Sequence, residues 1–257
     1  SGLGCKGAVL AALLWSAPPV NATAKVPDGI GGPYYDIRMV VLGDSLADGL
    51  WGSLRRAFAR CNRIELVRLT KVSDGLAGTD AEAWLDRYAR ATPIVEGATA
   101  AEIVIVQVGA NDITFLRDGT TRIVFGSPEW APGYASRARR LAEGLTDQAS
   151  AVIWLGLPIV GSARLQPHYR EISNLLRGAL SGTGAAFVDI HELTKFGSET
   201  FVMNARHDGR VVQMRATDRI HFTAVGYDRV LEWIAGDLIR VLAEIERSAA
   251  FQDVELQ

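Results

Sequence analysis

Short, almost wholly apolar runs recur along the chain and alternate with segments of helical periodicity. Apolar runs of five or six residues are typical of parallel strands that are covered on both faces. A helix is predicted after the first run, where apolar residues recur every four positions. The five runs are Ile37–Leu42, Ile64–Leu69, Ile103–Val108, Val152–Leu157 and Ala186–Ile190, and the helical positions are Leu46, Leu50, Leu54 and Phe58.

The last long segment carries one apolar stripe at helical spacing, with Thr223 placed to cap it. The stripe consists of Tyr227, Val230, Leu231, Ile234, Leu238, Val241, Leu242 and Ile245. Alternating strands and helices predict one α/β domain over residues 37–247, followed by a C-terminal tail at 248–257. We expect a three-layer αβα sandwich around a central, mostly parallel five-stranded sheet.

One segment breaks this alternation just before the final helix. Thr200–Met203 and Val211–Met214 have the composition of short strands, and the intervening Asn204–Gly209 is rich in turn residues. The pattern predicts a small β-hairpin.

The first 24 residues differ from the rest. Lys6 precedes the apolar run 7–15, and Ala22-Thr23-Ala24 follows as a candidate cleavage site. This arrangement is typical of a secretory signal peptide and is too short for a membrane-spanning helix. An alternative is an N-terminal helix packed on the domain. With cleavage, residues 25–36 become an extended lead-in, and we expect an exported protein, periplasmic or secreted, without stable membrane insertion.

Composition narrows the function classes. Apolar residues make up 48% of the chain and charged residues 22%, as in globular proteins. Lys and Arg number 27 against 29 Asp and Glu, so no basic surplus points to nucleic acid. The two cysteines, Cys5 and Cys61, are too few for a disulfide scaffold or a Cys-rich zinc site. The oligomeric state leaves no signal in the sequence.

The first stretch with candidate chemistry is Gly43-Asp44-Ser45-Leu46, directly after the first predicted strand. Ser45 is expected at the carboxyl edge of the sheet and at a helix N-terminus, where backbone N–H groups can bind a developing anion. Taken alone, Ser45 could equally be a simple helix cap.

Three further stretches fall on the same predicted edge. Gly75, with Gly78 as a competitor, offers a backbone N–H, and the side-chain amide of Asn111 could donate to an oxyanion. Asp218 and His221 can share one loop, with the carboxylate orienting the imidazole as a general base. Taken alone, Gly75 and Asn111 are more simply explained as turn residues, and Asp218 with His221 as a surface pair. Their joint order along the chain favours a catalytic site.

In these motifs the sequence resembles the SGNH hydrolases, the superfamily of GDSL-type esterases with a flavodoxin-like sheet. Gly-Asp-Ser-Leu at 43–46 matches the nucleophile block and Gly75 the glycine block. Gly109-x-Asn111-Asp112 matches the asparagine block, and Asp218-x-x-His221 the last block. The resemblance implies a Ser45–His221–Asp218 triad and an oxyanion hole formed by Ser45, Gly75 and Asn111. It also implies that Asp44, Gly109 and Asp112 are supporting residues of the site.

A closer resemblance covers residues 38 to about 245. The segments 125–130, 153–158 and 215–223 are similar to an uncharacterised, typically exported bacterial subgroup of that superfamily. Two positions depart from the subgroup pattern. Ala77-Gly78-Thr79-Asp80 stands where an Arg-Pro-Asp usually continues the glycine block, and Arg219 stands where glycine or proline is common.

The resemblance implies hydrolysis of carboxylic esters through an acyl-enzyme, with no metal or organic cofactor. Asp189-x-His191-Glu192 lacks a third ligand cluster nearby and is a poor candidate for a metal site. Export points to an acetyl or short acyl group on an envelope glycan as the substrate. Alternatives are a lipase-like or thioester hydrolase, an O-acyltransferase with the same triad, and a non-catalytic carbohydrate-binding protein of the envelope.

Overall fold

The computed structural model describes residues 37–60, 64–91 and 101–255. Its centre is a five-stranded sheet of order β2-β1-β3-β6-β7 in which every neighbouring pair is parallel. The strands are β1 (Ile37–Gly43), β2 (Ile64–Thr70), β3 (Ala101–Gln107), β6 (Ala151–Leu155) and β7 (Ala186–Val188). The predicted parallel sheet is confirmed, although β7 ends two residues before its apolar run does.

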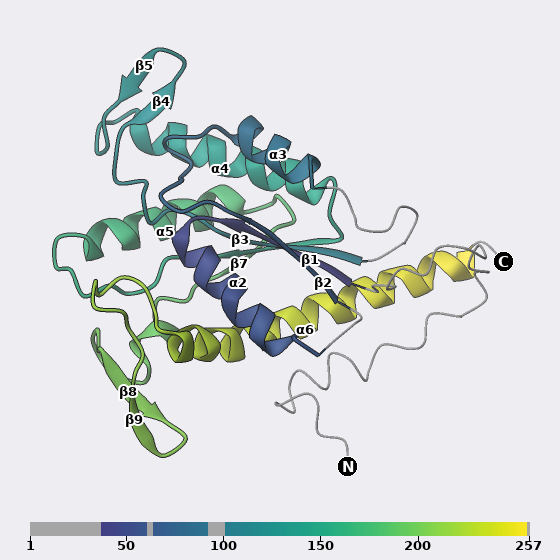
Figure 1. The fold of residues 1–257 in the computed structure, drawn as a ribbon. Coiled ribbons are helices and arrows are strands. Elements are labelled where there is room, and N and C mark those ends of the chain that lie inside the picture. Colours follow the sequence, from purple (N-terminus) through teal and green to yellow (C-terminus); the bar gives the residue numbers. More distant parts are fainter. Residues whose placement is uncertain (1–36, 61–63, 92–100, 256–257) are drawn as a thin grey trace.

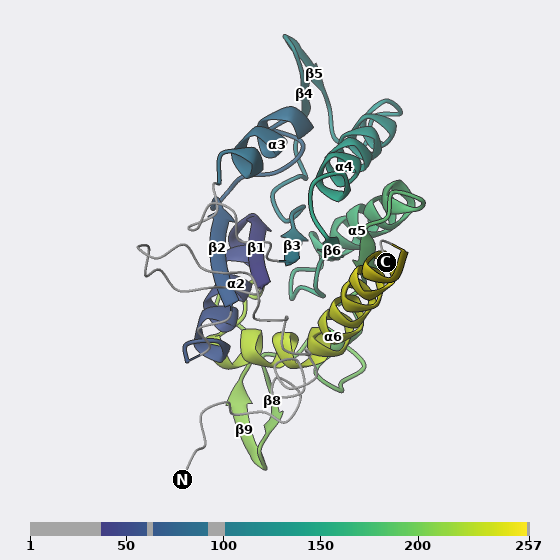
Figure 2. The same cartoon turned by 90° about the vertical axis from the view of Figure 1, so that its right-hand side faces the viewer.

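Helices cover both faces of this sheet (Figures 1 and 2). On one face α2 (Ser45–Ala57) packs against α6 (Ala224–Glu255). On the other face α4 (Trp130–Thr146) packs between α3 (Ala81–Ala89) and α5 (Gln166–Leu180). A short 3-10 turn, η1 (Leu193–Lys195), follows β7. The three-layer sandwich is therefore as predicted.

The core explains why the central strands are nearly all apolar. Val40, Val41 and Leu42 of β1 are fully buried, because helices cover both the odd and the even side chains of the strand. Leu46 and Leu50 of α2 are buried against the sheet. Burial of a side chain of this size stabilises the fold by roughly 1.5–3 kcal/mol.

Parallel strands carry their following loops to one edge of the sheet. The loop after β1 is held there by a glycine that no other residue can replace without a clash. Gly43 has a φ of +151°, and a Cβ at this position would lie 1.9 Å from the carbonyl oxygen of Gln107, the last residue of β3. The close approach lets the Asp44 N–H donate to that same oxygen at 3.1 Å.

Two antiparallel hairpins are attached to this frame. The predicted hairpin before α6 exists, but its strands are β8 (Asn204–His207) and β9 (Arg210–Gln213), so residues 200–203 are not a strand. The turn is Asp208-Gly209, with φ of +50° and +76°, a pair that the tight primed turns of hairpins require. A second hairpin, β4 (Leu116–Asp118) with β5 (Thr121–Ile123), was not predicted.

Several sequence predictions concern residues at the ends of the chain. The predicted signal peptide and lead-in at 1–36, and Cys5 and Cys61, lie outside the described residues. The boundary predicted at 247 lies within α6, which runs on to Glu255. In the part of the chain that the structure describes, no helix combines the length and apolar character needed to cross a membrane.

Candidate active site

Ser45 is the first residue of α2, directly after the turn that leaves β1. The preceding Asp44 is the helix cap, and its carboxylate accepts the Leu46 N–H at 2.9 Å. Asp44 therefore does the capping that Ser45 was alternatively expected to do, and the Ser45 hydroxyl is left to interact elsewhere. The Ser45 N–H lies in the first turn of the helix, where the dipole favours negative charge.

Asp218 and His221 form a compact loop just before α6. The carboxylate of Asp218 accepts the backbone N–H groups of Ile220 and His221 at 2.9 and 3.0 Å, and Nδ1 of His221 lies 2.6 Å from its second oxygen. Burial alone would raise the pKa of Asp218, but these hydrogen bonds from His221 and Ile220 outweigh it and lower the pKa. The carboxylate is thus ionised at neutral pH and orients the ring.

The two loops meet at the carboxyl edge of the sheet. Nε2 of His221 lies 2.7 Å from Oγ of Ser45, and the His221 side chain remains one-third exposed. A carboxylate, an imidazole and a hydroxyl therefore form one continuous hydrogen-bonded chain that ends at a solvent-accessible edge. Such an arrangement can move a proton from the serine hydroxyl to the imidazole.

Asn111 lies beside the glycine loop. Its Nδ2 donates one hydrogen to the Asp74 carbonyl at 3.0 Å, which fixes the amide and leaves its second hydrogen for another acceptor. The Gly75 N–H belongs to the same peptide group as that carbonyl and points the opposite way. It donates to the Asp74 carboxylate at 3.0 Å. An oxyanion could use the Gly75 N–H only in exchange for this bond.

Two buried carboxylates join the three loops. Asp44 accepts the N–H groups of Gly109 and Ala110 from the loop after β3, at 3.2 and 3.1 Å. Asp112 accepts the N–H groups of Leu76 and Ala77 from the loop after β2, at 3.2 and 2.9 Å. The three residues predicted to support the site, Asp44, Gly109 and Asp112, thus link successive loops.

Burial has a large effect on both carboxyl groups. It raises the pKa of Asp44 to about 7, against the opposing effect of the N–H donors, and the nearby charge of Asp112 adds to the rise. Burial likewise raises the pKa of Asp112 to about 6, although N–H groups and the Tyr134 hydroxyl at 2.7 Å favour its ionised form. The linking carboxylates therefore titrate well above the range of an exposed aspartate.

The Arg215 side chain holds the triad loop by hydrogen bonds to backbone carbonyls. In the sequence, Arg215 drew attention only as part of the segment 215–223. The fully buried guanidinium donates to the carbonyl oxygens of Ile220 at 3.0 Å, Ile159 at 2.7 Å and Thr194 at 3.0 Å. It also lies 3.9 Å from the centre of the Phe222 ring. Burial lowers the pKa of Arg215 to about 9, which still leaves it protonated at neutral pH. The residues on both sides of His221 are thus held by one side chain.

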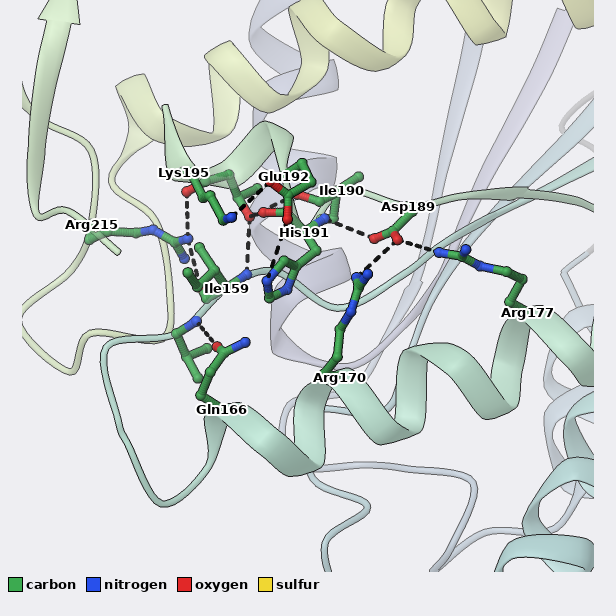
Figure 3. A network of polar contacts seen from close by, with 12 residues as sticks. Ile159, Gln166, Arg170, Arg177, Asp189, Ile190, His191, Glu192, Lys195 and Arg215 are labelled. Carbon is green, nitrogen blue, oxygen red and sulfur yellow. Dashed lines mark hydrogen bonds and ion pairs between the residues drawn. The ribbon is translucent and has the colours of Figure 1, made fainter. Parts of the chain in front are cut away.

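Asp189 and His191 belong to a neighbouring network of polar contacts (Figure 3). The Asp189 carboxylate forms ion pairs with Arg170, at 3.0 Å, and with Arg177. Burial lowers the pKa of His191, whose nearest acidic partner is Glu192 at 4.0 Å. Among the described residues, no group of three or more His, Cys, Asp or Glu side chains is arranged to hold a metal ion.

Arg219, between the triad acid and base, adopts a left-handed backbone with a φ of +63°. Glycine adopts this conformation without strain, so the backbone explains why glycine is common at this position, and nothing in the structure explains the arginine. The other departure, from Ala77 to Asp80, contains Gly78. A Cβ at Gly78 would meet no atom within 4 Å, whereas one at Gly75 would lie 2.1 Å from an oxygen of Asp112. Gly75 is therefore the glycine that the local packing requires.

The family model described as "Protein of unknown function (DUF459)" matches residues 38–236. The chain belongs to this DUF459 family. The match includes the whole sheet beyond its first residue, all four motifs and the first part of α6. No curated protein matches the sequence.

Solved structures show that this DUF459 protein shares its fold with SGNH and GDSL enzymes. The lipase/acylhydrolase from Enterococcus faecalis superposes with a TM-score of 0.50 and 18% identity, over 78% of this chain and 96% of that one. LAE5, an alpha/beta hydrolase enzyme from the metagenome of Lake Arreo, gives 0.52 and 18%, over 82% and 98%. The acetylxylan esterase Axe2 from Geobacillus stearothermophilus gives 0.50 and 14%, over 82% and 95%. The predicted resemblance holds at the level of the fold.

Proposed function

We propose that this DUF459 protein is a serine esterase that hydrolyses carboxylic esters through an acyl-enzyme. The observation that carries the proposal is the hydrogen-bonded chain from Asp218 through His221 to Ser45, with distances of 2.6 and 2.7 Å. The nucleophile comes from a segment 176 residues from the base, which shares one loop with the orienting acid, and the two segments meet at one exposed edge. A protein that only binds carbohydrate has no need of this proton path.

In the first half of the proposed reaction, Nε2 of His221 accepts the Ser45 proton as Oγ attacks the ester carbonyl. Asp218 stabilises the resulting imidazolium. The tetrahedral oxyanion is bound by the Ser45 N–H at the start of α2 and by the free hydrogen of the Asn111 amide. The Gly75 N–H is the third proposed donor, once it leaves the Asp74 carboxylate. His221 then protonates the departing alcohol oxygen, and Ser45 carries the acyl group.

In the second half, His221 takes a proton from water, whose oxygen attacks the acyl carbonyl. The same donors bind the second oxyanion, and its collapse releases the acid and returns the proton from His221 to Ser45. Every proton is carried by Ser45, His221 or water. The cycle requires no metal or organic cofactor.

We further propose that the natural substrate is an acetyl or short acyl ester on an envelope carbohydrate. The fold shared with an acetylxylan esterase supports this choice of substrate class. The signal peptide predicted at residues 1–24 supports an extracytoplasmic location for the reaction. Both supports are independent of the geometry around Ser45.

The direct test combines turnover and labelling. Purified protein and its Ser45→Ala variant are incubated with p-nitrophenyl acetate, and separately with a fluorophosphonate followed by peptide mass spectrometry. We expect wild-type turnover, a single label on Ser45, and a loss of about 10⁴–10⁶-fold in turnover in the variant. More than a tenth of wild-type activity in folded Ser45→Ala protein would show that Ser45 is not the nucleophile.

A further inference from the structure

Most arginines on the body of the protein have a carboxylate partner, whereas several at the edge that holds Ser45 have none. On the body, most guanidinium groups lie beside a carboxylate, as in Arg56–Asp228 and Arg139–Glu143. Six exposed arginines, all on loops or hairpins that follow the carboxyl ends of β3, β6 and β7, have no carboxylate within 4.0 Å among the described residues. These six, called here the rim arginines, are Arg117, Arg122, Arg164, Arg206, Arg210 and Arg219.

Two rim arginines form a pair that is unfavourable without a ligand. Arg117 of β4 lies directly opposite Arg122 of β5, and like charges at such positions repel. Their guanidinium carbons lie 5.6 and 4.5 Å from the centre of the same ring, that of Phe115. An anion placed between the two groups would convert the repulsion into charge-assisted hydrogen bonds, for which the planar guanidinium is well suited.

The hairpin that carries this pair is fixed to the proposed oxyanion loop. The Arg117 N–H donates to the Ala77 carbonyl at 2.9 Å. Arg137 joins the same parts, because its guanidinium donates to the carbonyls of Leu76 at 2.8 Å and of Arg117. A group bound by Arg117 and Arg122 is therefore held at a fixed position relative to Asn111 and Gly75.

The second hairpin is fixed to the triad loop. β9 leads directly into Met214, whose N–H donates to the Met203 carbonyl at 2.8 Å and whose own carbonyl accepts the Thr223 N–H at 2.9 Å. Arg206 of β8 and Arg210 of β9 lie on opposite faces of this hairpin, because Arg206 pairs with Val211 and Arg210 with His207. Figure 1 shows the two hairpins projecting from opposite sides of the edge at which α2 begins. Each hairpin carries two arginines and a single acid, Asp118 or Asp208.

We propose that the site takes esters carried on an acidic polysaccharide, with sugar carboxylates bound by the Arg117–Arg122 pair on one side of Ser45 and by Arg206 or Arg210 on the other. This proposal rests on the esterase function proposed above. Positive charge on both sides of the reacting atoms suits anionic groups that recur along a chain, rather than a small ester with one charge. Carboxylate groups suit the paired guanidinium geometry because each can accept two parallel hydrogen bonds.

The test compares two acetylated polymers that differ in charge, polygalacturonate and xylan. We expect kcat/KM for the acidic polymer to exceed that for xylan by about tenfold or more at low salt, and the advantage to shrink as salt screens the charges. In the Arg117→Gln/Arg122→Gln double variant the advantage should fall several-fold through KM. Turnover of p-nitrophenyl acetate should stay unchanged. Arg206→Gln/Arg210→Gln tests the other hairpin in the same way.

The matched control is Arg55→Gln. Arg55 also lacks a carboxylate partner among the described residues and lies over the Trp51 ring, but it is ten positions along α2 from Ser45, about 15 Å away. Equal hydrolysis of both polymers, or an unchanged preference in both double variants, overturns the acidic-glycan proposal, as does hydrolysis of p-nitrophenyl acetate with neither polymer cut. Absence of all turnover and of the Ser45 label instead overturns the esterase function.

Discussion

An oxygen of Asp112 occupies the space in which a side chain at Gly75 would begin, 2.1 Å from the position of its first atom. Gly75→Ala must therefore displace the carboxylate that holds the N–H groups of Leu76 and Ala77. We expect a loss of folding stability of about 1–3 kcal/mol, from N–H groups left without acceptors, and a large loss of esterase activity. Thermal unfolding and turnover of p-nitrophenyl acetate measure the two effects.

Gly78→Ala is the matched control, because its Cβ meets no atom within 4 Å. Its stability should stay within about 0.5 kcal/mol of wild type, with full activity. If Gly78→Ala were the more damaging change, the oxyanion-hole glycine would be Gly78 and not Gly75.

Asn111→Ala should leave a small, measurable activity. It removes the proposed amide donor to the oxyanion and also the bond from Nδ2 to the Asp74 carbonyl. Loss of one oxyanion donor costs roughly 10²–10³-fold in turnover. The fluorophosphonate should still label Ser45, because His221 and Asp218 are untouched. Turnover within threefold of wild type would exclude Asn111 from the oxyanion hole.

Asp218→Ala should reduce activity only in part. The variant loses the partner of His221 Nδ1 and the acceptor of two backbone N–H groups in the same loop. A backbone carbonyl can sometimes orient an imidazole instead, so we expect a smaller loss than in Ser45→Ala or His221→Ala. Steady-state kinetics of the three variants give the order directly. A wild-type rate for Asp218→Ala would remove Asp218 from the triad.

Arg215→Lys tests a positioning role. Lysine keeps the charge but cannot hold the Ile220, Ile159 and Thr194 carbonyls with one planar group. We expect kcat to fall about tenfold or more with little change in KM, and fluorophosphonate labelling of Ser45 to slow in proportion. Both are measured well below the melting temperature of the variant. A lower melting temperature with unchanged kcat and labelling rate would assign Arg215 a purely structural role.

Stability should depend on pH through Asp44. Burial raises the pKa of Asp44 to about 7, whereas the pKa of an aspartate in the unfolded chain is about 3.9. The folded state thus binds this proton more tightly, and the Asp44 contribution to the unfolding free energy falls as pH rises between about 4 and 7, by up to about 1.4 kcal/mol per pH unit.

Asp44→Asn removes this titration. The unfolding free energy of wild type minus that of Asp44→Asn should therefore fall from pH 5 to pH 8, as measured by urea unfolding at each pH. A difference that stays constant across this range would mean that Asp44 does not titrate there.

The sequence predicted those parts of the structure that depend on local pattern. Apolar runs located the five strands. Four short motifs put Ser45, Gly75, Asn111 and the Asp218–His221 loop at one edge of the sheet, because parallel strands bring the loops that follow them together. The hairpin before α6 was placed a few residues off, since the Asp208-Gly209 turn signal was hidden within a turn-rich segment.

Other features depend on contacts that no local pattern contains. The β4–β5 hairpin consists of two three-residue strands, too short for periodicity to detect. The links from Asp44 to Gly109 and from Asp112 to Leu76 join residues 65 and 36 positions apart. The burial of Arg215 among carbonyls is equally nonlocal. Only the folded arrangement could show which charged residues hold the loops together.

The links made by Asp44 and Asp112 also have a consequence for how this fold can change. They fix the reacting loops to one another without using any atom of the two hairpins, which are joined to those loops by separate hydrogen bonds. Either hairpin could therefore be exchanged for one of another length or charge while the machinery at Ser45 keeps its shape. In this family, new substrates could arise by replacement of the hairpins alone.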